Sequence, residues 1–274
     1  MTHEKHVSYT SYLKVNELLE LQEPLSDGPE HDELLFITIH QVYELWFKQI
    51  LHETAAAQRA LEAGDTHRAL ALLGRVRTIM KTCVGQLDIL ETMTPLQFNS
   101  FRSRLSSASG FQSAQFRELE AVLGRRDQAG KDADKTTGMG MADHLVPGSK
   151  ARARVEDAMS RASLWDSALG YFNTRSPLPI DVLERDVTKA WEPHEGVQQV
   201  LIKIHREDPE AALIGEALVD LDEGLQEWRY RHVKMVERTI GRKMGTGGSS
   251  GAGYLASTLF NPVFPDLWAI RSQF

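Results

Sequence analysis

Residues 31–53 read HDELLFITIHQVYELWFKQILHE, and their apolar side chains recur at the spacing of an amphipathic helix. Steps of four, three, four and four residues separate Leu35, Ile39, Val42, Trp46 and Ile50. The pattern begins after the turn residues Asp27-Gly28-Pro29 and lasts to Gly64. The sequence therefore predicts one long helix across this stretch.

Further helices are predicted, each with its own start signal. Asp65 can cap a second helix, and Thr94-Pro95-Leu96-Gln97 is a capping box with proline at the first helical position of a third. After a turn over residues 106–110, Phe111 to Leu123 are expected to form a short helix. Pro209, which follows Asp208, can start a very long helix with an apolar stripe made of Leu221, Leu225, Trp228, His232, Met235 and Thr239.

Strand signals are nearly absent, because no convincing run of alternating β-branched residues lies between turn signals. We therefore predict an all-α protein built as a bundle of long antiparallel helices. Residues 124–150 break the helical pattern and are expected to form a surface excursion, and residues 244–253 (MGTGGSSGAG) a Gly/Ser loop. No repeat or linker divides the chain, so residues 1–274 are expected to form one domain.

The composition is that of a soluble globular protein of 274 residues, with 42% hydrophobic and 25% charged residues. A net charge of −7 argues against nucleic acid or an anionic membrane as the main partner. Cys83 is the only cysteine, which excludes an intrachain disulfide, a Cys₄ zinc site and an iron–sulfur cluster held by this chain alone. No apolar run approaches the roughly 20 residues of a membrane span. A cytoplasmic location is expected.

The Gly/Ser loop is the least ordinary segment of the sequence. Residues 251–256 (GAGYLA) formally fit a dinucleotide-binding pattern, but they follow a helix and no βαβ unit surrounds them. Two interpretations remain open: a flexible linker, or a lid whose amides and hydroxyls close over a small polar ligand.

Two of the ten histidines lie on apolar helix faces, His40 and His232. A satisfied core histidine is the more common explanation for such a residue, but a single imidazole in an apolar slot is also how proteins bind haem iron. Phe36 lies one turn before His40, a pairing that suits a flat heteroaromatic ligand with one N–H. Phe98 and Arg102 repeat this spacing, and a buried arginine there would pair with a carboxylate.

Several stretches together resemble the tryptophan 2,3-dioxygenase family. They cover most of the chain in the family's order, with a weaker match over residues 124–210. The motifs are Tyr9-x-x-Tyr12-Leu13, residues 31–53, LETMTPLQFNSFR (90–102), SASGFQSAQFR (107–117), WRYRH (228–232) and GTGGSSGAGYL (245–255). The resemblance implies an all-α bundle that encloses a b-type haem. It also implies that both atoms of O₂ are inserted across the indole C2–C3 bond of L-tryptophan, which gives N-formyl-L-kynurenine.

The resemblance implies roles for residues that bind the cofactor. His232 is similar to the proximal ligand of the haem iron, and Ser109 and Gly110 would lie at the haem edge.

Other residues are similar to the family's substrate-binding residues. His40 resembles the distal catalytic histidine that hydrogen-bonds the indole N–H, and Phe36 the ring that packs against the indole. Arg102 resembles the clamp for the substrate carboxylate, and Thr246 a lid hydroxyl that meets the ammonium and carboxylate groups. Phe98 is expected at the substrate wall, where some members carry tyrosine, so a hydroxyl contact is absent here.

The resemblance also implies a homotetramer in which subunits exchange their N-terminal arms. Tyr9 and Tyr12, within an arm over residues 1–25, resemble residues that a neighbouring subunit lends to the pocket.

Three alternatives stay open on the sequence alone. The same scaffold could perform monooxygenation of a tryptophan-like indole, it could be a haem- or ligand-binding sensor without turnover, or it could be a helical scaffold without a cofactor.

Overall fold

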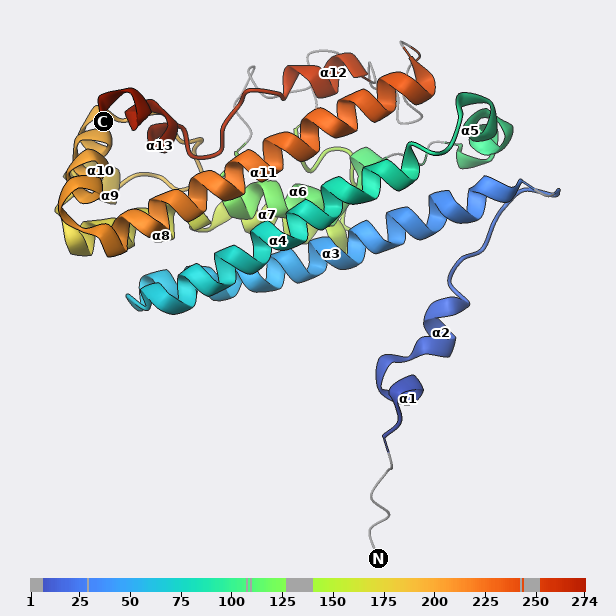
Figure 1. Cartoon of the computed structure of the whole chain (residues 1–274), viewed down its shortest axis with the longest axis horizontal. Coiled ribbons are helices and arrows are strands. Elements are labelled where there is room, and N and C mark those ends of the chain that lie inside the picture. Colours follow the sequence, from blue (N-terminus) through green and yellow to red (C-terminus); the bar gives the residue numbers. More distant parts are fainter. Residues whose placement is uncertain are drawn as a thin grey trace, which may run out of the picture.

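The computed structural model describes residues 7–28, 30–106, 108, 110–126, 140–241, 243 and 252–274, and this part of the chain consists of helices and turns without a strand. Three long helices dominate it, α3 (His31–Glu62), α4 (Thr66–Leu90) and α11 (Pro209–Ile240), and α4 packs against both of the others. Figure 1 shows α3 running antiparallel to α4 and α11. The predicted all-α class is confirmed. No helix in the described ranges is long and apolar enough to cross a membrane.

A tight turn joins α3 to α4. Gly64 has a φ of 71°, a left-handed conformation that glycine adopts without steric cost. The Asp65 side chain then accepts a hydrogen bond from the backbone N–H of Arg68, so the predicted cap of α4 is confirmed. Because α3 begins at His31, the turn residues at 27–28 lie before it.

Two other predicted helix starts are confirmed. Thr94 and Gln97 form a reciprocal capping box before α5 (Pro95–Arg102). The Asp208 side chain accepts from the backbone N–H of Ala211 at the start of α11. These local signals set where α5 and α11 begin, and both helices border the cavity described below.

The helix predicted from Phe111 begins later than expected. Residues 110–112 form a 3₁₀ turn, η2 (Gly110–Gln112), and α6 (Ala114–Leu123) starts after Ser113, whose side chain accepts from the backbone N–H of Phe116. The remaining elements are α1 (Tyr9–Leu13), α2 (Val15–Leu19), η1 (Ser103–Leu105), α7 (Lys150–Ser160), α8 (Leu164–Arg175), α9 (Ile180–Leu183), α10 (Glu195–Glu207), α12 (Ala252–Ser257), α13 (Pro265–Ala269) and η3 (Ile270–Gln273).

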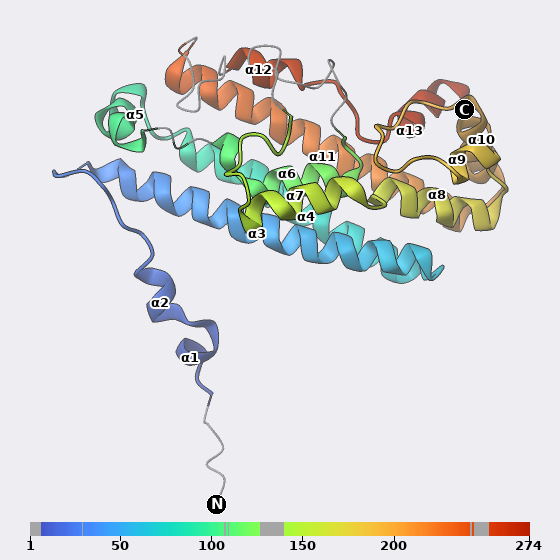
Figure 2. The same cartoon turned by 180° about the vertical axis from the view of Figure 1, so that it is seen from behind.

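A second layer covers the open side of α3. Figure 2 shows α7 lying along α6 and α8 continuing beside α3, and both pairs are in contact. At the end of the bundle near α8, α10 and α13, the ring of Trp165 packs 5.5 Å from Phe264 and 5.8 Å from Trp191, measured between centroids. We call this region, closed by α8, α10 and α13, the packed end.

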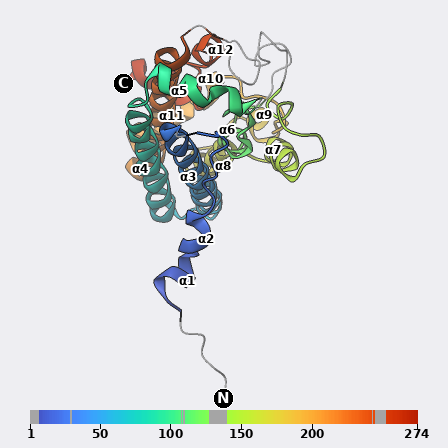
Figure 3. The ribbon, with the colours of Figure 1, turned by 90° about the vertical axis from the view of Figure 1, so that its right-hand side faces the viewer.

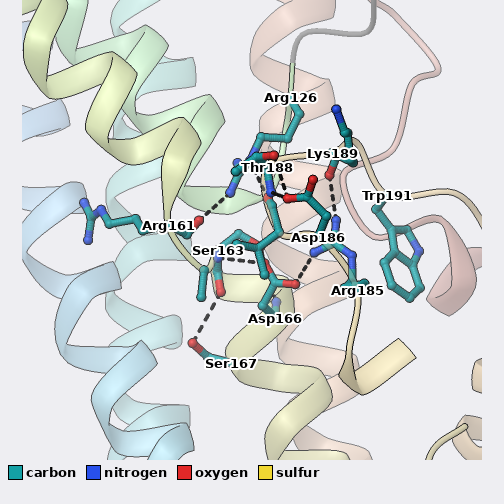
Figure 4. A network of polar contacts seen from close by, with 12 residues as sticks. Arg126, Arg161, Ser163, Asp166, Ser167, Arg185, Asp186, Thr188, Lys189 and Trp191 are labelled. Atoms are coloured by element: carbon teal, nitrogen blue, oxygen red, sulfur yellow. Dashed lines mark hydrogen bonds and ion pairs between the residues drawn. The ribbon is translucent and has the colours of Figure 1, made fainter. Parts of the chain in front are cut away.

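Residues 124–150 were expected to form a surface excursion, and the described residues at both ends of this stretch are anchored to the bundle. Arg126 is buried and donates hydrogen bonds to the backbone carbonyls of Ala121, Arg161 and Val187; Figure 4 shows it pointing toward Arg161. Beyond residue 139, Ala142 and Leu145 are buried against Val155 of α7. Both flanks of residues 127–139 therefore belong to the folded body.

The N-terminal arm leaves the bundle. Figures 1 and 3 show α1 and α2 projecting away from the other helices. The base of the arm is tied to α3, because the Glu33 carboxylate accepts the backbone N–H groups of Leu25 and Ser26. Tyr9 and Tyr12 are each 76% exposed, and neither contacts the body of its own chain.

Candidate functional site

A cavity of about 510 Å³ lies at the end of the bundle where α3 begins and α4 and α11 end. Helices α3, α4, α5, α6, α11 and α12 all contribute side chains to its walls. Six of the predicted site residues line it, namely Phe36, His40, Phe98, Arg102, Gly110 and His232. The cavity therefore brings together residues that are far apart in the sequence.

His232 presents a neutral imidazole to this cavity. Burial lowers its pKa to about 4, and electrostatic interactions with His40 and Arg117 act in the same direction. Its ring stacks on Trp228, with centroids 5.1 Å apart and planes at 13°. It makes no hydrogen bond to any residue that the structure describes. A neutral nitrogen lone pair facing an apolar cavity is suited to bind a metal.

His40 faces the same cavity from α3 with a fixed tautomer. Its Nδ1 lies 2.7 Å from the backbone oxygen of Phe36, and because a carbonyl only accepts, Nδ1 carries the proton. Burial lowers the pKa of His40, against the opposing effects of the Phe36 hydrogen bond and the Glu44 charge. Nε2 of the neutral ring is therefore a hydrogen-bond acceptor, which suits an N–H donor.

Aromatic rings and one arginine complete this side of the cavity. The Phe36 ring lies 4.1 Å from the His40 ring and 5.8 Å from Phe98, between centroids. Arg102, in the last turn of α5, lines the cavity and is partly buried. A flat ring and a carboxylate could be bound here together.

An ionic cluster in the cavity wall was not predicted from the sequence. Glu120 of α6 is 3% exposed and accepts from Arg117 at 2.6 Å, from Arg229 of α11 at 2.6 Å and from Arg125 at 3.3 Å. These arginines hold the pKa of Glu120 at about 2, although burial alone would raise it. The sequence feature that could have indicated this cluster is Glu120 itself, a charged residue one turn from Phe116 on the apolar face of a short helix.

A second carboxylate in the wall was also missed. Glu44, one turn after His40, accepts from the Ser113 hydroxyl at 2.5 Å and from the Gln115 amide at 2.8 Å. It therefore ties the start of α6 to α3, beside the turn that carries Gly110.

Four of the predicted site residues do not line the cavity in the described structure. Tyr9 and Tyr12 lie on the projecting arm, away from the cavity of their own chain. Ser109 and Thr246 lie outside the described residues. Further along the chain, Leu255 of α12 and Thr258 line the cavity.

Among the described residues, no three His, Cys, Asp or Glu side chains gather into a site for a bare metal ion.

The chain is similar to proteins of one family along its length. A family model described as Tryptophan 2,3-dioxygenase matches residues 1–152 and 181–274, which include all the cavity-lining residues named above. A protein named tryptophan 2,3-dioxygenase from Anaeromyxobacter sp. (strain K) is 56% identical over 269 residues, which is 98% of this chain and 97% of that protein. Proteins of the same name from Herpetosiphon aurantiacus and Caulobacter vibrioides are 54% identical over 268 residues and 42% over 272, each covering 97% of this chain and 98% of the relative.

Proposed function

This chain belongs to the tryptophan 2,3-dioxygenase family, and from that premise we propose that its cavity binds haem b and L-tryptophan together for cleavage of the indole C2–C3 bond by O₂. The product is N-formyl-L-kynurenine, and the reaction opens tryptophan breakdown along the kynurenine route. The observation that carries the proposal is that His40 of α3 and His232 of α11 line one cavity with Phe36 and Arg102. A cytoplasmic location stays a prediction from the sequence.

The cavity residues fit haem. His232 offers a neutral nitrogen, and the walls around it are rich in aromatic and aliphatic side chains. Arg117 and Arg229 also line the cavity, where both side chains donate to the Glu120 carboxylate. Ser109 and Gly110 would lie at its edge. When bound, ferrous haem supplies the iron that binds O₂ and activates it.

The remaining residues would orient L-tryptophan. The indole N–H would donate to Nε2 of His40, whose other nitrogen is held by the Phe36 carbonyl. The Phe36 ring would pack on the indole, Phe98 would form part of the same wall, and Arg102 would pair with the carboxylate. A site that pairs a charged group rejects ligands without it strongly, which would give specificity for the amino acid.

His40 acts here as an orienting acceptor. Oxygen addition to the electron-rich indole does not require prior removal of the N–H proton, so the neutral ring only holds that proton in a hydrogen bond. Thr246 would close the site from the Gly/Ser loop and meet the ammonium and carboxylate groups.

The arm and the oligomer are part of this proposal. Tyr9, Tyr12 and several leucines of α1 and α2 are exposed on a segment that projects from the body. Such a segment buries its apolar side chains only against another molecule. We place it on a neighbouring subunit of a homotetramer, where the two tyrosines would complete the pocket. Deletion of residues 1–12 should raise KM for tryptophan without loss of haem, whereas a fully active monomer would contradict the arrangement.

The proposed function can be tested by absorption spectroscopy and by isotopic labelling of O₂. The purified protein should show a Soret band and, with isotopically labelled O₂ and only catalytic reductant, should give a product that carries two labelled oxygen atoms. Ring cleavage needs no external electrons once the iron is ferrous, because the indole supplies them. A product with one labelled atom, or a need for stoichiometric reductant, would indicate monooxygenation instead. A Soret band without any turnover would indicate a sensor.

A further inference from the structure

We propose that Glu120 is a positioning residue for the haem ligand: through Arg229 it fixes the turn of α11 that precedes His232, and with it the separation of the α6 and α11 walls of the cavity. The inference rests on the proposed role of His232. It assigns a function to a buried carboxylate that the reaction itself does not use.

The contact between the two walls is made by neighbouring residues on each side. On α6, Phe116 and Glu120 lie one turn apart; on α11, Trp228 and Arg229 are consecutive. The Phe116 ring lies 4.8 Å from the Trp228 ring, between centroids, and Glu120 Oε1 lies 2.6 Å from Arg229 Nη2. Helix α6 therefore holds α11 at two adjacent points.

These two points lie one helical turn before His232. Trp228 sets the plane of the imidazole by stacking on it. Packing between aromatic rings tolerates sliding, whereas a charge-assisted hydrogen bond of 2.6 Å fixes both distance and direction. The ion pair is therefore the more directional of the two contacts that α6 makes with this part of α11.

Burial makes both partners of the Glu120–Arg229 pair dependent on each other. Glu120 is 3% exposed and Arg229 is 5% exposed, so water does not replace either partner easily. The other described acceptor for Arg229 is the Thr258 carbonyl, at 3.4 Å, in the segment after α12. Without the Glu120 charge, Arg229 would need a new partner, and the turn that carries His232 would shift with it.

A purely structural ion pair would also stabilise the fold, so a second buried, paired carboxylate is needed as the control. Glu53 of α3 is likewise buried, at 4% exposure, and pairs with Arg75 of α4 at 2.8 Å, but it does not line the cavity. Glu53→Gln removes a buried paired carboxylate elsewhere in the same bundle. Any effect that it shares with Glu120→Gln reports on the fold alone.

The experiment compares haem-loaded native protein, Glu120→Gln and Glu53→Gln. The readouts are the iron–histidine stretching band of the ferrous form by resonance Raman and the rate of haem transfer to apomyoglobin. Because outer residues that orient a ligand typically change affinity by about 10–100-fold, Glu120→Gln should speed haem loss about tenfold or more and shift or broaden the band. Glu53→Gln should change neither, even where it lowers the unfolding temperature.

Two further variants keep the inference falsifiable. If Glu120→Gln does not fold, Glu120→Asp retains the charge at shorter reach and should move both readouts in the same direction. In Glu120→Gln with Arg229→Gln the buried Arg229 charge is removed together with its partner, so stability should recover in part while the haem dissociation rate stays high.

A native-like band and dissociation rate in Glu120→Gln, or equal changes in Glu53→Gln, would overturn the inference. Failure of the proposed function would look different, since the native protein itself would then bind no haem.

Discussion

The two halves of α11 lie in different surroundings although one helical pattern runs through both. In the first half, Ile214, Leu218 and Leu221 are buried in the packed end of the bundle. In the second half, Trp228, His232, Met235 and Thr239 line the cavity. The difference shows that an unbroken apolar stripe specifies the helix but not whether the stripe meets core or an open site.

Polar groups in the two halves are used differently. Asp222, in the packed half, is buried and accepts hydrogen bonds from the backbone N–H groups of Val263 and Phe264 and from the Trp268 indole. His232, in the cavity half, has no hydrogen-bond partner among the residues that the structure describes. The Asp222 carboxylate is used up in packing, whereas the His232 imidazole lies open to the cavity and can meet a ligand there.

The largest expected effect is on haem content. It should fall when a histidine is removed at the cavity end and stay native when one is removed at the packed end. His232→Ala should lose most bound haem because the iron loses its only protein ligand. His205→Ala should keep it, since His205 lies at the packed end and pairs with Glu216. The Soret absorbance per protein measures both. Native haem content with an unchanged ferrous spectrum in His232→Ala would show that this histidine is not the ligand.

Truncation of a large side chain should lower the unfolding free energy more at the packed end than at the cavity end, the reverse of the order expected for haem content. Phe264→Ala, at the fully buried packed end, should cost about 3–5 kcal/mol of unfolding free energy, because a cavity opens where atoms fill the space. Phe98→Ala should cost less, because its ring is partly exposed and already borders the open cavity. Urea unfolding of the two variants gives the comparison. Equal losses would mean that the cavity end is as tightly packed as the other end.

Arg102→Ala should weaken tryptophan binding by tens of fold, with little effect on the fold. Removal of one partner of a desolvated charge pair costs about 2–5 kcal/mol. Arg206→Ala, on α10 at the packed end, is the matched control, and its tryptophan affinity should be native. Equilibrium titration with tryptophan and with tryptamine, which lacks the carboxylate, measures the effect. If native protein bound the two ligands equally well, Arg102 would have another role.

Local sequence signals predicted the elements well because they act over a few residues. The caps at Asp65 and Thr94 fall where they were predicted, and α11 begins at Pro209 as predicted. The helix from Phe111 was placed too early, because Ser113 caps it and residues 110–112 form a 3₁₀ turn that apolar spacing does not reveal.

The site was predicted only in part, for a physical reason. His40, Phe36 and Arg102 were found because each pairing lies within one helix or one family motif. The Glu120–Arg229 pair joins residues 109 positions apart, and no spacing rule links two such positions. A contact of that kind depends on where the folded bundle places α6 relative to α11 and becomes visible only in the folded chain.

The smallest expected effect concerns His40, the partner of His232 across the cavity. His40→Ala should lower turnover and leave measurable activity, because a single neutral hydrogen bond contributes only about 0.5–1.5 kcal/mol. Because burial lowers the pKa of His40 below 6.5, its ring stays neutral as the pH falls through that value. Substrate affinity of the native protein should therefore hold through pH 6.5 and fall only once the pH passes the lowered pKa, where Nε2 becomes protonated and can no longer accept.

Removal of the His40 ring should also change which indoles the site accepts. 1-Methyltryptophan has no indole N–H and carries a methyl group toward Nε2, so the native site should bind it poorly. His40→Ala removes the opposing ring and should bind 1-methyltryptophan more tightly than native protein does, as measured by ligand-induced shifts of the Soret band. Complete loss of turnover in His40→Ala, with haem and tryptophan still bound, would instead assign His40 the role of a base that removes the indole proton.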